Sequence, residues 1–142
     1  MKRKTFNLEI NASRERVWDV LWNDKTYGQW TAPFCEGTYA ESDWNEGSEI
    51  LFMAPNNNGM YGIIDKKKEP ELMAFKHLGE IQKGEKVKKD WDSVMEIYEL
   101  EDEGETTNLK VSMDMEAEYE DFFDKTFPKA LENVKKLAEN QQ

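Results

Sequence analysis

The chain has 142 residues, of which 38% are hydrophobic and 35% charged, and a formal net charge of −11 at pH 7. The length fits a single domain over residues 1–142, and the apolar content is too high for a disordered chain. The negative charge repels phosphate groups, so we expect no binding to nucleic acid or to an anionic membrane surface.

The negative charge is concentrated in one stretch. Twelve acidic residues and one lysine lie between Trp91 and Asp121, and the rest of the chain is neutral. Solvated strand faces joined by a turn explain such a stretch, and so does a docking patch for a basic partner. The first case is the commoner one.

The single cysteine and the hydropathy pattern indicate a location. Cys35 has no second cysteine to pair with, and a buried lone thiol is typical of a reducing compartment. No stretch approaches the roughly 20 apolar residues of a membrane-spanning helix, and no apolar segment follows the basic N-terminus. We therefore expect a cytoplasmic protein with a buried Cys35.

The first predicted elements are a strand and two short helices. Alternating apolar residues predict a strand over residues 5–10. Ser13 and Asp24 are suited to cap two short helices, and the second helix should end near Trp30.

Strands and turns fill the middle of the chain. Apolar or alternating segments bounded by turn residues predict strands over residues 36–40, 49–54, 60–67, 72–78, 91–100 and 106–115. Their short connections make neighbouring strands antiparallel. Residues 79–90 hold four lysines and two glycines, which predicts an exposed mobile loop or an extended hairpin tip.

A helical period begins near residue 118. Phe123 and Phe127 belong to an apolar stripe over residues 118–140, and Leu131 widens it. Pro128 lies inside the stripe, where it should kink or restart the helix. The whole order predicts an α+β fold, with a seven-stranded curved antiparallel sheet wrapped around a long C-terminal helix and two short helices between strands one and two.

Several local motifs resemble those of a known fold family. The motifs lie at residues 10–13 leading into 17–21, at Trp30, and at residues 44–48, 69–72, 75–79 and 127–131. In these segments the chain resembles the START/Bet v 1-like (SRPBCC) superfamily, which has the helix-grip fold. More narrowly, it is similar to the bacterial proteins related to the C-terminal domain of the activator of heat-shock protein 90 ATPase. Superfamily members include lipid carriers, ligand-binding allergens, polyketide cyclases and co-chaperone domains.

The sequence offers little for catalysis or metal binding. His77 is the only histidine, and no motif places a nucleophile beside it. One histidine and one cysteine do not make a zinc site, and the acidic residues near 114–121 lack the spacing of a calcium loop. Glu96 and Glu99 lie on opposite faces of one strand, so one of them should be a polar group in a cavity. We expect no catalytic residue, no metal and no cofactor.

These observations favour a non-enzymatic binding module. We expect a hydrophobic cavity between the sheet and the C-terminal helix, holding a small apolar or amphipathic ligand. The expected lining residues are Trp30, Phe52, Phe75, His77, Val111, Met113, Phe123, Phe127 and Leu131. The first alternative is a co-chaperone-like interaction protein with a chaperone partner, and the second is a cyclase- or isomerase-type enzyme. We expect a monomer or a weak homodimer.

Overall fold

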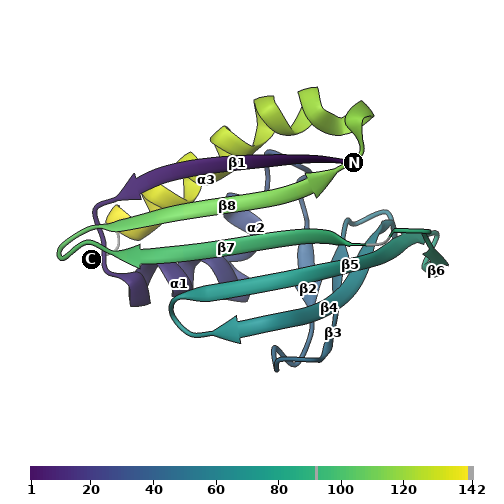
Figure 1. Cartoon of the computed structure of the whole chain (residues 1–142), viewed down its shortest axis with the longest axis horizontal. Coiled ribbons are helices and arrows are strands. Elements are labelled where there is room, and N and C mark those ends of the chain that lie inside the picture. Colours follow the sequence, from purple (N-terminus) through teal and green to yellow (C-terminus); the bar gives the residue numbers. More distant parts are fainter. Residues whose placement is uncertain (92, 141–142) are drawn as a thin grey trace.

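The structure is a computed structural model that describes residues 1–91 and 93–140. The described residues form a curved antiparallel sheet with the helices on one of its faces (Figure 1). The strands are β1 (Lys2–Ile10), β2 (Tyr39–Glu41), β3 (Glu49–Met53), β4 (Gly59–Lys68), β5 (Leu72–Gln82), β6 (Glu85–Lys88), β7 (Val94–Asp102) and β8 (Thr107–Met115). The helices are α1 (Arg14–Trp22), α2 (Asp24–Trp30) and α3 (Glu120–Asn140), with a short 3-10 turn, η1 (Ala117–Tyr119), before α3. The predicted helix-grip fold class is confirmed.

The strand order is β1-β8-β7-β5-β4-β3-β2, and β6 pairs with β5 alone. The chain therefore forms a meander from β2 to β8, and β1 adds to the far edge by pairing with β8. The eighth strand, β6, lies in the segment 79–90, which is the extended hairpin and not a loop. Asp92, part of the predicted strand over residues 91–100, lies outside the described residues.

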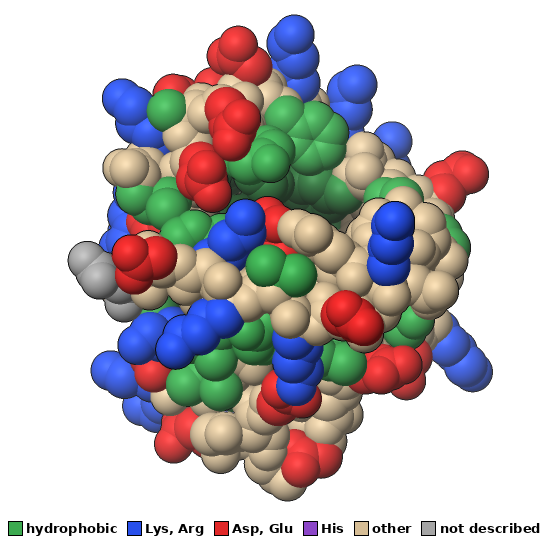
Figure 2. All heavy atoms as spheres, turned by 90° about the vertical axis from the view of Figure 1, so that its right-hand side faces the viewer, with side chains coloured by type: hydrophobic (Ala, Val, Ile, Leu, Met, Phe, Trp, Pro, Cys, Tyr) green, Lys and Arg blue, Asp and Glu red, His purple; other side chains and the backbone are tan. Residues whose placement is uncertain are grey.

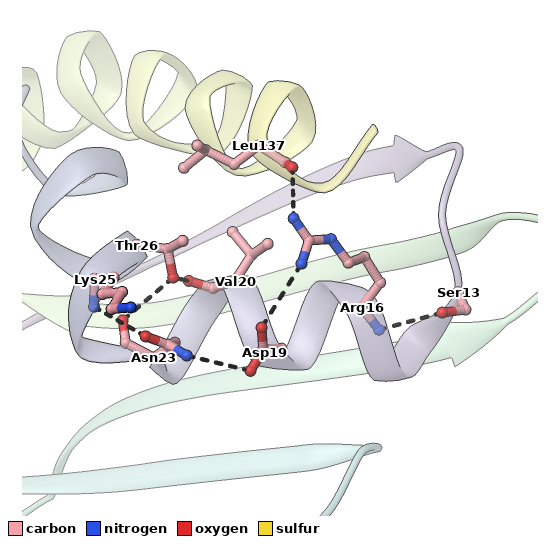
Figure 3. A network of polar contacts seen from close by, with 8 residues as sticks. All are labelled: Ser13, Arg16, Asp19, Val20, Asn23, Lys25, Thr26 and Leu137. Carbon is pink, nitrogen blue, oxygen red and sulfur yellow. Dashed lines mark hydrogen bonds and ion pairs between the residues drawn. The ribbon is translucent and has the colours of Figure 1, made fainter. Parts of the chain in front are cut away.

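The two short helices, α1 and α2, are each capped at their N-terminus, and a hydrogen bond joins α1 to α3 (Figure 3). The Ser13 hydroxyl accepts a hydrogen bond from the backbone N–H of Arg16 and so caps α1, as predicted. The cap of α2 is Asn23 and not Asp24, because the Asn23 side chain accepts the orphan backbone N–H at the start of that helix. The Arg16 guanidinium donates to the carbonyl of Leu137, 3.1 Å away near the end of α3.

Helix α3 lies across α1, α2 and β1. Its apolar stripe faces the core, where the ring of Phe127 is 2% exposed and stacks on Phe6 with ring centroids 5.0 Å apart. The helix continues through Pro128, so the restart predicted there does not occur. The proline removes only one backbone donor, to the carbonyl of Asp124.

The prediction that Cys35 is buried is wrong, because its side chain is exposed. It lies in the irregular segment after α2, where the thiol contacts the neighbouring carbonyl oxygen of Glu36, 3.6 Å from Sγ. The thiol is therefore not part of the hydrophobic core. Among the described residues, none of the helices is long and apolar enough to cross a membrane.

Candidate functional site

A cavity of about 250 Å³ lies between the sheet and the helices, and we call it the main cavity. It opens at the end of the molecule where α3 begins and the β3–β4 hairpin turns. Figure 2 shows this side, with hydrophobic side chains gathered around a recess and charged side chains surrounding them. The helices and the loop after α2 supply aromatic walls: Tyr27, Trp30, Phe34, Phe122, Phe123 and Phe127.

The sheet supplies the floor of the main cavity. Its floor residues come from five neighbouring strands: Phe52, Met60, His77, Glu96, Tyr98 and Met113. Strand alternation places Glu96 and Tyr98 on the inner face of β7, while Glu99 is exposed on the outer face. The expectation that one of the two glutamates points inward therefore holds for Glu96.

A register shift helps to set the position of His77. Gly62 on β4 lies opposite His77, and the β4–β5 register shifts between Tyr61 and Gly62. A Cβ atom at Gly62 would lie 2.1 Å from the carbonyl oxygen of Lys76, so only glycine fits this close approach. The resulting bulge bends the sheet beside the polar part of the cavity.

His77, Glu96 and Tyr98 form a hydrogen-bonded cluster, which we call the polar cluster. The His77 Nε2 atom lies 2.9 Å from Glu96 Oε1, and the Tyr98 hydroxyl donates to Glu96 Oε2 over 2.5 Å. The His77 side chain is 2% exposed and that of Glu96 13% exposed. One carboxylate in a mostly apolar cavity thus has two protein partners.

The surroundings of the polar cluster act on two phenols. Burial, together with the Glu96 charge and the hydrogen bond to it, raises the pKa of Tyr98 well above its usual value. Burial and the Glu96 charge also raise the pKa of Tyr27. Tyr98 therefore stays protonated and remains a hydrogen-bond donor to Glu96 at neutral pH.

The second ring nitrogen of His77 has no hydrogen-bond partner in the part of the chain that the structure describes. Nδ1 is buried, and none of the described protein atoms forms a hydrogen bond with it. Glu96 accepts from Nε2–H when the ring is neutral, so Nδ1 then carries a lone pair. The polar cluster is thus not fully satisfied by the protein.

A second hollow of about 240 Å³ lies beside the main cavity, and we call it the side hollow. The two spaces share Met60, Met113 and Phe123 as lining residues. Methionine side chains are flexible and adapt to irregular shapes. The partition between the spaces is therefore made largely of adaptable side chains.

The predicted cavity residues fall into two groups. Six of them line the main cavity: Trp30, Phe52, His77, Met113, Phe123 and Phe127. The other three, Phe75, Val111 and Leu131, are buried in the close-packed core and are not among its described lining residues. Phe75 lies next to the cavity, since its ring centroid is 5.1 Å from that of Phe52.

Sequence reasoning missed Tyr27, Phe34 and Tyr98. Tyr98 was accessible from the sequence, because it lies two positions after Glu96 and shares its strand face. Phe34 follows a proline in an irregular segment, where no helical or strand periodicity indicates which way a side chain points. Among the described residues, no group of three or more histidine, cysteine, aspartate or glutamate side chains is placed to hold a metal ion.

Comparisons with known proteins agree on the fold. The Aha1 dimer from Colwellia psychrerythraea has a TM-score of 0.74 at 16% identity, over 96% of this chain and 95% of that chain. Protein MLL2253 from Mesorhizobium loti has a TM-score of 0.78 at 9% identity, over 99% of both chains. CalU16 from Micromonospora echinospora has a TM-score of 0.69 at 14% identity, over 96% of this chain and 75% of that chain.

At such low identities these structures show the fold alone, and no curated protein matches the chain. The family comparison is more specific. The model of a family described as Activator of Hsp90 ATPase homolog 1-like protein matches residues 11–139, in agreement with the resemblance found in the sequence. Because this match spans nearly the whole chain, the chain belongs to the Activator of Hsp90 ATPase homolog 1-like protein family.

Proposed function

We propose that the chain is a binding module whose main cavity holds a small apolar or amphipathic molecule. The observation that carries the proposal is an aromatic-walled cavity with one small polar cluster on its floor. Sites for small molecules commonly combine apolar walls with a few polar groups that fix the orientation of the ligand. The main cavity has both features.

The size of the main cavity sets the size of the ligand. A dry protein cavity of about 150 Å³ holds benzene, and the main cavity has about 250 Å³. A molecule with one or two rings fits this space. Burying one aromatic ring removes about 150–250 Å² from water, worth about 4–6 kcal/mol before the costs of binding are deducted.

A fluorescence titration tests the proposal. The two-ring dye 1-naphthylamine, which is neutral at pH 7, should show a saturable blue shift of its emission with the parent protein, because its rings leave water on binding. Ala54→Phe adds bulk to the lining of the main cavity and should weaken binding about tenfold or more. Ala117→Phe adds the same side chain at an exposed position outside the lining and should bind the dye like the parent. Absence of saturable binding in the parent, or equal binding by both variants, would reject the proposal.

A second candidate function follows from the family. Family membership, together with a solved structure of an Aha1 dimer of the same fold, supports a chaperone-assisting or homodimeric interaction protein. Tyr119 and Phe122, which are 45% and 46% exposed near the mouth of the cavity, are candidate contact residues. The test is the ATP turnover of heat-shock protein 90 with and without the chain. Several-fold stimulation that Phe122→Ala abolishes would favour this candidate, and unchanged turnover would reject it.

A further inference from the structure

The Glu96 carboxylate keeps unused capacity to accept hydrogen bonds. A carboxylate has about four lone-pair sites, and the protein occupies one on each oxygen, through His77 and Tyr98. The side chain is 13% exposed and lines the main cavity. A buried carboxylate is costly unless it is paired with a positive charge, so a ligand that supplies such a charge gains by binding here.

The protein itself supplies little compensating charge. The described lining residues of the main cavity include no lysine and no arginine. Tyr98 donates a hydrogen bond but is neutral. His77 contacts the carboxylate through Nε2, and its buried Nδ1 has no hydrogen-bond partner among the described residues.

The walls of the main cavity favour the same sign of charge. Aromatic ring faces carry negative potential and attract ammonium groups at distances up to about 6 Å. Trp30, Phe52 and Phe123 come from three separate elements and all line the space around the carboxylate. Aromatic walls around one carboxylate are the chemistry that recognises an organic cation.

The entrance is also acidic. Residues 116–121, which run from the end of β8 into the first turn of α3, contain four acidic side chains and no basic one. Phe122 and Phe123 follow directly and line the main cavity. One acidic residue of this segment, Glu120, is paired with Lys4. The remaining field attracts cations and repels anions, which raises the local concentration of a positively charged ligand.

We propose that the main cavity selects small ring-bearing amines, whose ammonium group donates to Glu96 while the ring lies among the aromatic walls. This inference rests on the proposed function, since it assigns a ligand class to the same cavity. A carboxylate-bearing ligand of the same size should be excluded, because its charge would face that of Glu96.

The test compares two probes of the same shape. At pH 7, 2-phenylethylamine is a cation and 2-phenylethanol is neutral, and both are titrated into ¹⁵N-labelled parent protein by NMR. The amine should bind about tenfold more tightly, because a charge-assisted hydrogen bond contributes more than a neutral one. Glu96→Gln should reduce the preference to within about twofold while the alcohol still binds.

Glu99→Gln is the matched control, because it removes the same charge from the outer face of β7. It should keep the preference of the parent. If Glu96→Gln does not fold, the ¹³C shift of the Glu96 carboxylate in the parent decides: it should move with the amine and not with the alcohol. Binding of both probes with equal affinity would overturn the amine selectivity and leave the binding module standing. Binding of neither probe would overturn both proposals.

Discussion

The hydrogen bond from Tyr98 to Glu96 ties two inner-face residues of β7 together. Tyr98→Phe removes the donor and leaves one carboxylate oxygen without a protein partner. We expect a loss of about 1–3 kcal/mol in the free energy of unfolding, measured by urea denaturation. Tyr39→Phe is the control, because Tyr39 is 41% exposed and the change should cost less than about 0.5 kcal/mol. Equal effects at the two positions would argue against a structural role for the polar cluster.

The same surroundings predict a dependence on alkaline pH. The pKa of Tyr98 is raised above its ordinary value of 10.0 in the folded state, so the unfolded chain loses this proton first. The contribution of Tyr98 to stability is therefore full below pH 10 and is lost as the pH rises above it. Absorbance at 295 nm should show that Tyr98 and Tyr27 ionise only as near-ultraviolet circular dichroism is lost. Ionisation of all five tyrosines in the native protein would contradict this.

The polar cluster shows how far sequence reasoning reaches at single residues. Alternation along β7 was enough to place one of Glu96 and Glu99 inward, but the choice depended on the register. The register of β5 against β7 places Phe75 opposite Glu96 and His77 opposite Val94. His77 and Glu96 are therefore diagonal neighbours on adjacent strands, a contact that no local sequence pattern specifies. A bulge at Gly62 also shapes this region, and the local sequence pattern did not predict it.

At the scale of elements, two of the phenylalanines of α3, Phe123 and Phe127, have different surroundings. Phe127 is 2% exposed and contacts Phe6 and Phe34, whereas Phe123 is only partly buried and lines both hollows. Phe127→Ala should therefore cost about 3–5 kcal/mol of stability. Phe123→Ala should cost less, because the space beside it is already open, and should change the affinity for the two-ring dye 1-naphthylamine more.

Urea denaturation and dye titration of both variants provide this comparison. A core-sized loss at both positions, with no dye binding by the parent, would mean that the interior is filled. The stripe on α3 was predictable because its helical period is long and unbroken. Its continuity through Pro128 was not, since packing against α1, α2 and β1 holds the helix together despite the missing donor.

At the scale of the whole molecule, the net charge of −11 predicts the absence of nucleic-acid binding. Fluorescence anisotropy of a labelled DNA duplex should stay flat at micromolar protein and physiological salt. Micromolar affinity would overturn the prediction. The net charge is a property of the sequence alone, whereas the position of the acidic residues 116–121 near the mouth of the cavity depends on how β8 leads into α3.

The fold class was predictable because strand alternation, turn residues and the final helical stripe all agreed. The exposure of Cys35 and the presence of strand β6 were not predictable, because both depend on how a connecting segment packs against or pairs with its neighbours. A space between the sheet and α3 was an expectation from the fold class, and its polar floor could not be predicted from the sequence.

The central claim is that a small molecule binds between α3 and the sheet. The most direct measurement is the map of ¹H–¹⁵N shift changes when the parent protein is titrated with 2-phenylethanol. The account predicts saturable changes at His77, Tyr98 and Phe123, which lie on β5, β7 and α3 around the main cavity. Changes confined to the exposed residues Tyr39 and Tyr119, which do not line the main cavity, or no saturable changes at all, would contradict it.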